Sequence, residues 1–138
     1  MGQSLNVLIV QEDRANFLLL ERFLRKQGGV AECRRVDSEA ELDRGLQGDW
    51  DVVLSDHNVP GMDFCSILRR IKARHPDLPV ILVSGSTGDE TATELLRLGA
   101  SDLVRMDDLV RLPTAIRRAV EEVGARRTRR TAENARVK

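Results

Sequence analysis

Two acidic side chains and one hydroxyl side chain stand at the ends of three short apolar segments. These residues are Glu12, Asp56 and Ser84. An aspartate can act as a nucleophile toward a phosphoryl group, and a serine hydroxyl can donate a hydrogen bond to a phosphoryl oxygen. Neighbouring carboxylates repel each other, whereas Mg²⁺ accepts one or two carboxylates together with water and phosphate oxygens. If the fold brings the three side chains together, their chemistry suits Mg²⁺-assisted phosphoryl transfer to Asp56.

Apolar runs predict the strands that would carry these side chains. Leu5–Val10, Asp51–Ser55 and Leu78–Ser84 are apolar almost throughout, as the buried strands of a parallel sheet are. A weaker alternating pattern and a short apolar run predict two further strands, over Val30–Val36 and Ser101–Arg105.

Helical periodicity separates the predicted strands. It predicts helices over residues 14–27, 38–48, 63–74 and 87–99, a loop over residues 56–62, and a final helix with apolar residues from Leu112 to Val123. Capping boxes at Ser38–Glu41 and Thr87–Glu90 are predicted to begin two of these helices. Pro113 is acceptable only in the first turn of the last helix.

The alternation of strands and helices predicts βαβ units with right-handed crossovers. The predicted fold class is α/β, with a doubly wound, five-stranded parallel sheet in the flavodoxin-like order 2-1-3-4-5. In this order the first, third and fourth strands are neighbours. Glu12, Asp56 and Ser84 would then share the carboxyl edge of the sheet, where open α/β sheets bind ligands.

Four segments of the sequence carry a resemblance to a known family. They are VLIVQED, DVVLSDHNVPGMD, LPVILVSGS and LGASDLV. Together they resemble the response-regulator receiver domain of two-component signalling, over residues 5–123. The resemblance implies that a histidine kinase or a histidine phosphotransfer domain phosphorylates Asp56. It also implies that Glu12, Asp56 and the backbone carbonyl of Asn58 bind Mg²⁺, and that Ser84 supplies the hydroxyl of the family's switch.

Two positions of the expected site depart from the family pattern. The family has two acids after the first strand, where this chain has Gln11 and Glu12, unless Asp13 replaces the missing acid. The family has a lysine after the last strand, where this chain has Met106. Arg105 is adjacent, but neighbouring strand residues point to opposite faces, so it would substitute only if a β-bulge shifted the register.

These two exchanges leave the formal charge of the expected pocket unchanged. We therefore hypothesise that one loss compensates the other, so that the pocket still binds Mg²⁺ but has fewer groups to orient the phosphoryl. Leu103 is a third departure, since the family usually has Tyr or Phe there. Either the output is routed differently or Leu103 simply packs against the last helices.

Other interpretations of the same residues stay open. Acidic residues after strands are commonly helix N-caps, and Asp13 in particular could cap the first helix. The alternative function is a phosphate-independent receiver-like module, a pseudo-receiver. A nucleotide or flavin binder is disfavoured, because no glycine-rich phosphate loop follows the first strand. Neither receiver interpretation is an enzyme beyond self-catalysed phosphoryl transfer to Asp56 and its hydrolysis.

The composition is that of a globular domain without a membrane span. The chain has 138 residues, of which 41% are hydrophobic and 32% charged, and this suits one domain. No apolar run approaches the roughly 20 residues that a membrane-spanning helix needs, and the first residues do not form a signal peptide. We therefore predict a cytoplasmic protein in which Cys33 and Cys65 are reduced, partly buried thiols.

Charge divides the chain into a receiver body, residues 1–123, and a basic tail, residues 124–138. The tail has six basic residues and one acid, so it carries +5 and leaves −5 on the rest of the neutral chain. We predict that the tail is a frayed helical extension or a disordered linker to a downstream domain, in preference to a nucleic-acid contact. Leu18 is predicted to be exposed for partner docking or a homodimer, with extra core packing as the alternative.

Overall fold

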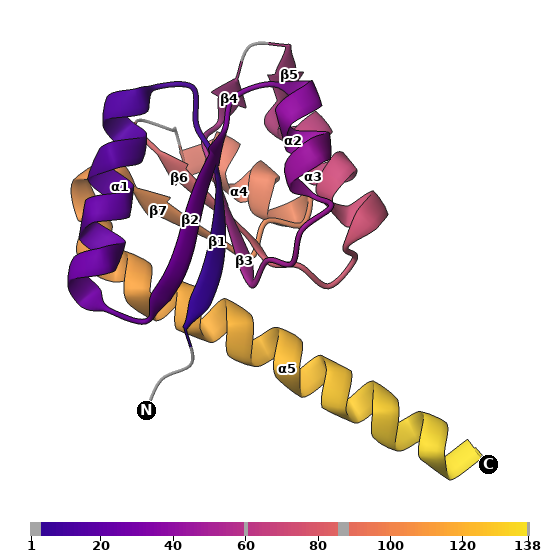
Figure 1. Ribbon diagram of the computed structural model, residues 1–138. Coiled ribbons are helices and arrows are strands. Elements are labelled where there is room, and N and C mark those ends of the chain that lie inside the picture. The colour runs from indigo at the N-terminus through magenta and orange to yellow at the C-terminus, as the bar shows by residue number, and fades with distance from the viewer. Residues whose placement is uncertain (1–3, 60, 86–88, 138) are drawn as a thin grey trace.

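Five parallel strands form the central sheet, as the sequence predicts. The computed structural model describes residues 4–59, 61–85 and 89–137. Within this part the strands lie in the order β2-β1-β3-β6-β7, which is the predicted order 2-1-3-4-5 (Figure 1). Their bounds are β1 Leu5–Val10, β2 Val30–Val36, β3 Val52–Ser55, β6 Val80–Ser84 and β7 Asp102–Arg105.

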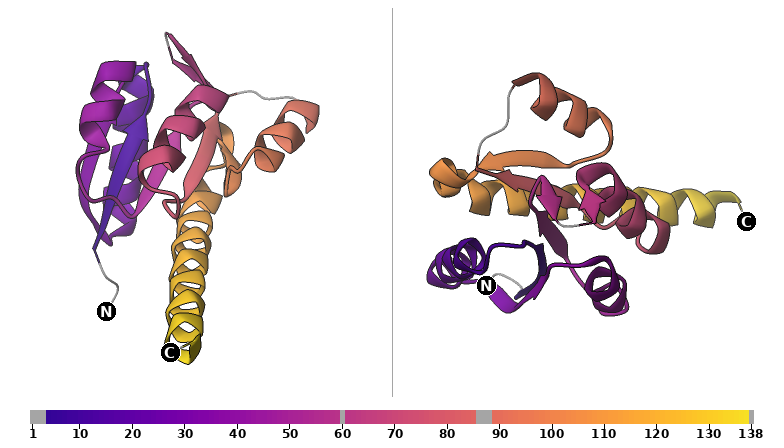
Figure 2. Two further views of the ribbon diagram at one scale, coloured as in Figure 1. Left: turned by 90° about the vertical axis from the view of Figure 1, so that its right-hand side faces the viewer. Right: turned by 90° about the horizontal axis from the view of Figure 1, so that it is seen from above.

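Helices cover both faces of the sheet (Figure 2). They are α1 Arg14–Gln27, α2 Glu39–Gly45, α3 Phe64–Arg74, α4 Asp89–Arg97 and α5 Leu112–Val137. Leu8 and Val10 of β1 belong to a core cluster with residues of α2, α3 and α4, whereas Val7 and Ile9 belong to a second cluster with residues of α1 and α5. Each such fully buried side chain contributes about 1.5–3 kcal/mol through the hydrophobic effect, so the sheet is held from both sides.

Two of the boundaries that differ from the predicted ones have a side-chain hydrogen bond beside them. The helix α2 stops at Gly45 rather than near Gly48, and the Trp50 indole Nε1 donates a 2.7 Å hydrogen bond to the Gly45 carbonyl. Asp51 lies outside β3, and its carboxylate accepts a 2.8 Å hydrogen bond from the backbone N–H of Asn6. The Ser38 cap is confirmed, since its hydroxyl accepts from the Glu41 N–H at 3.2 Å.

The other predicted capping box, Thr87–Glu90, begins outside the described residues. The described part of its helix, α4, ends at Arg97, and Gly99 follows with a φ of 123°. Such a positive φ suits glycine after a helix end.

The predicted loop over residues 56–62 is wrong in part, because it contains a small antiparallel hairpin. The strands β4 (Asn58–Val59) and β5 (Met62–Asp63) pair, with Val59 opposite Met62. Both of these side chains are buried in the cluster beside α3. Gly61 has a φ of 84°, which permits the reversal between the strands.

A 3₁₀ segment, η1 Met106–Arg111, leads into α5 and was not predicted. Pro113 lies in the first turn of α5, as expected. The helix then continues to Val137, so the basic tail is helical in this structure, and Figure 1 shows α5 projecting from the body. Val123 of α5 is buried in the body, and Gly124 and Ala125, which follow it, are exposed.

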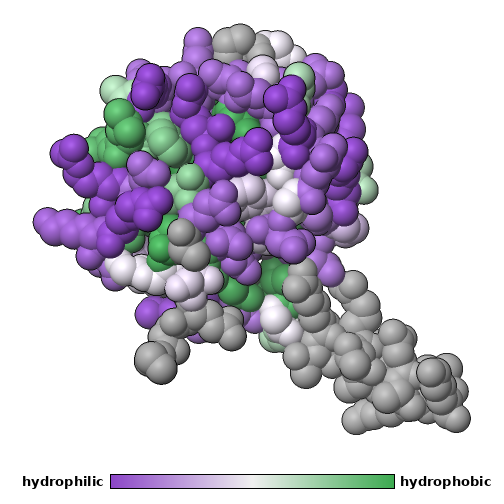
Figure 3. Space-filling view, in the orientation of Figure 1, coloured by the Kyte–Doolittle hydropathy of each residue, from purple (hydrophilic) through white to green (hydrophobic). Residues whose placement is uncertain are grey.

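The face of the molecule that Figure 3 shows is largely hydrophilic. No helix in the described ranges combines the length and apolar character that crossing a bilayer requires. Figure 3 shows apolar surface over α1 on an otherwise mostly hydrophilic face. Leu18 and Leu19 are 48% and 50% exposed, which confirms the predicted exposure of Leu18. Cys33 and Cys65 are free and half-buried, as predicted, and burial raises the pKa of the Cys33 thiol.

Candidate functional site

Adjacent strands carry Glu12, Asp56 and Ser84 to one edge of the sheet. The strands β1 and β3 pair with Val10 opposite Ser55, and the Asp56 N–H donates a 2.9 Å hydrogen bond to the Val10 carbonyl. The strand β3 pairs in turn with β6, which ends at Ser84. Because the strands are parallel, all three residues lie at the carboxyl edge, as the sequence predicts.

Asp56 is half-buried, and the backbone fixes one side of its carboxylate. Its Oδ1 accepts a 2.7 Å hydrogen bond from the N–H of His57. The Ser55 hydroxyl donates to the Asp56 carbonyl at 2.9 Å. Among the residues that the structure describes, Oδ2 of Asp56 has no hydrogen-bond partner. The carboxylate is therefore oriented through one oxygen, and the other remains available for chemistry.

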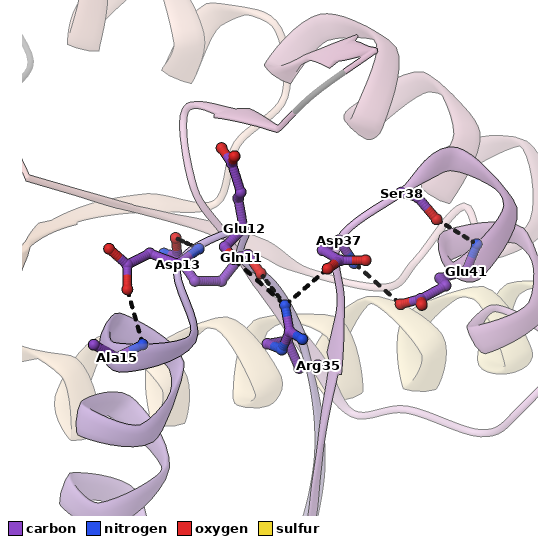
Figure 4. A network of polar contacts seen from close by, with 8 residues as sticks. All are labelled: Gln11, Glu12, Asp13, Ala15, Arg35, Asp37, Ser38 and Glu41. Atoms are coloured by element: carbon purple, nitrogen blue, oxygen red, sulfur yellow. Dashed lines mark hydrogen bonds and ion pairs between the residues drawn. The ribbon is translucent and has the colours of Figure 1, made fainter.

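The three residues after β1 have different environments. Glu12 is exposed, and Figure 4 shows its side chain pointing away from Arg35. Asp13 is the N-cap of α1, because its Oδ1 accepts hydrogen bonds from the N–H groups of Ala15 at 2.8 Å and Asn16 at 3.2 Å. Gln11 is only 2% exposed, and its Oε1 accepts from the Asp13 N–H at 3.1 Å. Asp13 therefore has the capping role that the sequence offered as one interpretation.

Sequence reasoning missed Arg35 of β2, which reaches the same segment. Its Nη1 donates to the backbone carbonyls of Gln11 at 3.3 Å and Glu12 at 3.4 Å, and to the Asp37 carboxylate at 2.9 Å (Figure 4). In the sequence, the only signal is that Arg35 stands one residue before the end of a predicted strand. The contact depends on the β1–β2 register, which sets Arg35 opposite Ile9.

The last strand presents no cation in place of the expected lysine. Met106 is partly buried and packs against the cluster of α1 and α5. Arg105 stands opposite Ser84 in an unshifted register, and its side chain is 57% exposed and pairs with Asp107 at 3.0 Å. The β-bulge that would let Arg105 replace the lysine does not form.

A model of the response regulator receiver domain matches residues 7–117. The chain belongs to this family. Receiver domains are signalling domains of two-component systems, and the five-stranded flavodoxin-like fold agrees with this assignment.

The receiver has curated relatives that are much longer. It is 31% identical over 134 residues to the DNA-binding transcriptional regulator NtrC of Proteus hauseri, covering 96% of this chain and 28% of the relative. It is 39% identical over 97 residues to the response regulator protein FleR of Pseudomonas aeruginosa, covering 70% of this chain and 20% of the relative. The chain thus spans less than a third of these relatives.

Solved structures of receiver proteins share the fold. NtrX from Brucella abortus superimposes with a TM-score of 0.82 at 25% identity, over 94% of this chain and 30% of that one. The beryllofluoride-activated NtrC4 receiver domain dimer gives a TM-score of 0.75 at 22% identity, over 86% of this chain and 98% of that one. The second likeness concerns the fold alone.

The oxygen ligands that this receiver domain offers fit a Mg²⁺ site that keeps several water ligands better than a site enclosed by protein side chains. Within the described residues, no group of three or more His, Cys, Asp or Glu side chains gathers as a metal cage. Gln11 supplies an amide rather than a carboxylate, and the Asp13 carboxylate caps α1. Glu12 and Asp56 supply two carboxylates, and Asn58 begins β4 two residues after Asp56. Two carboxylates with waters and a phosphoryl oxygen meet the usual needs of Mg²⁺.

Leu103 packs against the core of the domain. It is half-buried against the core cluster that includes Leu82 and Leu95. Its carbonyl accepts a 3.2 Å hydrogen bond from Arg111. These contacts agree with the packing interpretation of this position.

An apolar hollow lies near the amino ends of β1 and β2, whereas Asp56 lies at the carboxyl ends of the strands. It measures about 360 Å³ and lies between α1, the start of β1 and α5, with Leu24, Val30 and Ile116 among its lining residues. Its lining offers Arg117 and Glu121 as charged groups at the α5 side. It holds none of the residues predicted for the site.

Proposed function

We propose that this receiver domain accepts a phosphoryl group on Asp56, with Mg²⁺ bound, and signals through protein contacts. The observation that carries the proposal is the half-buried carboxylate of Asp56, with Oδ1 held by the His57 N–H and Oδ2 without a partner among the described residues. Asp56 directly follows β3, and β3 is hydrogen-bonded to β1, the strand that precedes Glu12.

Each proposed role follows from the chemistry of the residue. Oδ2 of Asp56 attacks phosphorus, and the bond from phosphorus to the donor breaks. Glu12, Asp56 and the Asn58 carbonyl would hold Mg²⁺, which neutralises charge on the transferred phosphoryl. The Ser84 hydroxyl would donate to a phosphoryl oxygen. Catalysis is limited to this self-catalysed transfer and to hydrolysis of the product.

We propose a histidine kinase or a histidine phosphotransfer domain as the phosphodonor, and a cytoplasmic location. The body, residues 1–123, carries a net charge of −5, which disfavours direct contact with nucleic acid. The relatives named NtrC are DNA-binding regulators, of which this chain spans about a fifth to less than a third. Residues 124–138 would therefore act as a linker to a downstream domain, with any DNA contact made outside the body. A homodimer would form through the exposed Leu18 of α1.

Intact-protein mass spectrometry after incubation with Mg²⁺ and acetyl phosphate tests the proposal. The wild-type protein is expected to gain one phosphoryl group, and Asp56→Asn none. Asp13→Asn is the matched control, because asparagine caps helices as well as aspartate does, and it should be labelled like the wild type. An unlabelled wild-type protein, under conditions that label another receiver, would favour the phosphate-independent alternative. Labelling that persists in Asp56→Asn would remove Asp56 as the acceptor.

A further inference from the structure

A single nitrogen of Arg35 ties the segment after β1 to its neighbouring strand. Nη1 donates to the carbonyls of Gln11 and Glu12, at 3.3 Å and 3.4 Å, and to the Asp37 carboxylate at 2.9 Å. Figure 4 shows the guanidinium between the backbone of Gln11 and Glu12 on one side and Asp37 on the other. Two successive carbonyls beyond the strand end are thus held by one charged donor.

The partner of Arg35 is itself fixed to the start of α2. The backbone N–H of Asp37 donates to Oε2 of Glu41 at 3.3 Å, and the N–H of Glu41 donates to the hydroxyl of Ser38 at 3.2 Å. Ser38 is the N-cap of α2. A continuous set of contacts therefore leads from the Gln11–Glu12 backbone, through Nη1 of Arg35 and the Asp37 carboxylate, to the first turn of α2.

The Glu12 carboxylate depends on this backbone for its position. In the described structure its side chain has no hydrogen bond or ion pair of its own. The neighbouring Gln11 supplies an amide rather than a second carboxylate, so Glu12 is the one acid between β1 and the Asp13 cap. A displacement of the Glu12 backbone would therefore move the only carboxylate that this segment offers to a cation.

We propose that Arg35 is a positioning residue for the Mg²⁺ site, which holds the Glu12 carboxylate in place through its backbone carbonyl. The inference rests on the proposed function, because it requires Glu12 and Asp56 to bind a cation. Arg35 and Asp37 form an ion pair, so their charges largely cancel toward the site. The contribution of the pair is geometric rather than electrostatic, as it is for groups that orient metal ligands.

A charge-neutral double substitution separates position from charge. Arg35→Gln with Asp37→Asn removes both charges and leaves the net charge unchanged. We expect the dissociation constant for Mg²⁺, measured by isothermal titration calorimetry, to rise by about tenfold. Arg35→Lys keeps one charged nitrogen with three N–H donors on a shorter chain. Its dissociation constant for Mg²⁺ should lie between those of the wild type and the double variant. Arg34→Gln is the matched control on the exposed neighbour of the same strand, and should bind Mg²⁺ like the wild type.

Amide hydrogen exchange measured without Mg²⁺ gives a readout that does not depend on metal binding. The Asp13 N–H, which donates to Gln11, is expected to exchange faster in the double variant and in Asp37→Asn alone, but not in Arg34→Gln. If the double variant does not fold, the exchange rate of the Asp13 N–H in Asp37→Asn alone tests the positioning role of Arg35.

The outcomes distinguish this inference from the proposed function. If the wild type binds no Mg²⁺, both fail. If the wild type binds Mg²⁺ and the folded variants bind it equally well, only the positioning role of Arg35 is overturned. Faster exchange at Asp13 together with weaker Mg²⁺ binding supports it.

Discussion

At the residue scale, two departures from the family pattern change the charge of the site in opposite directions. Gln11 is buried, and its amide oxygen satisfies the Asp13 N–H, so the position serves the backbone without adding negative charge. Met106 packs into the α1 and α5 cluster, so that position adds no positive charge. The charge-compensation hypothesis therefore requires that a charge at position 11 and a charge at position 106 would both act on the same bound Mg²⁺.

Restoring each charge should move Mg²⁺ affinity in opposite directions. Gln11→Glu adds a carboxylate beside Glu12 and should tighten Mg²⁺ binding by about tenfold, equivalent to about 1.4 kcal/mol of partly screened attraction. Met106→Lys should weaken binding by several-fold, and the double variant should bind nearly like the wild type. Isothermal titration calorimetry of the four proteins measures all three effects.

Gln47→Glu is the matched control for the first substitution, since Gln47 is exposed beyond the end of α2. It should leave Mg²⁺ affinity unchanged. Without Mg²⁺, Gln11→Glu should lower the free energy of unfolding, because it buries an unpaired carboxylate. Equal affinities in all variants would contradict the compensation hypothesis.

At the element scale, side-chain caps set where the helices around the site begin. Asp13 caps α1, Ser38 caps α2 and Asp63 caps α3. The Asp63 Oδ1 accepts a 2.8 Å hydrogen bond from the backbone N–H of Ser66. That hydrogen bond, followed by one with the Ser66 side chain, lowers the pKa of Asp63 from its ordinary value of 3.8.

This pKa shift predicts a pH-dependent contribution of Asp63 to stability. Because the folded pKa is lowered, the stabilisation is present above the ordinary value of 3.8 and is lost as the pH falls through the folded pKa. Asp63→Asn keeps the capping oxygen but cannot titrate. Urea unfolding at a series of pH values should show the wild type more stable than Asp63→Asn near neutral pH, with the difference shrinking below the ordinary value. A difference that stays constant through the acid range would contradict this role.

The elements that sequence reasoning predicted are those with a long or repeated pattern. The three apolar strands and the periodic helix α1 bury one side or both, so their residue types reveal them. The hairpin of β4 and β5 has two residues in each strand, which is too short for any periodicity. The 3₁₀ segment η1 likewise has no buried residue.

The site was predictable only where it follows the strand order. Glu12, Asp56 and Ser84 stand at a strand end or within two residues of one, so the topology alone groups them. The Arg35 contact depends on side-chain reach across the β1–β2 register. The pairing of Arg105 with Asp107 depends on the turn into η1. Neither has a signature in the order of residues.

At the scale of the whole molecule, α5 belongs both to the body and to the segment beyond it. Its first part buries Leu112, Ile116 and Ala119 in the core cluster with α1, and Val123 is also buried. Gly124 and Ala125 are exposed. We therefore expect residues 126–138 to add little to the stability of the body, consistent with the proposed division at residue 123.

Truncation of α5 at two points tests this division. A chain that ends at Ala125 keeps every buried side chain of α5 that the structure describes, and should keep its free energy of unfolding within about 0.5 kcal/mol of the wild type. A chain that ends at Arg118 loses the buried side chains of Ala119 and Val123. The decrease in its free energy of unfolding should be several times larger. Urea unfolding of the three proteins gives the comparison. Equal destabilisation by both truncations would show that the tail stabilises the body.

The geometric premise of the whole account is that a cation and a phosphoryl group are bound where β1, β3 and β6 end. Backbone amide NMR of the wild-type protein, titrated with beryllofluoride and Mg²⁺ together, tests this premise most directly. We expect the largest shifts at Glu12, Asp56 and Ser84 when both components are present, smaller shifts around Glu12 and Asp56 with Mg²⁺ alone, and no shifts with beryllofluoride alone. Unchanged spectra, or shifts confined to the apolar hollow beside Leu24 and Ile116 at the opposite edge, would contradict it.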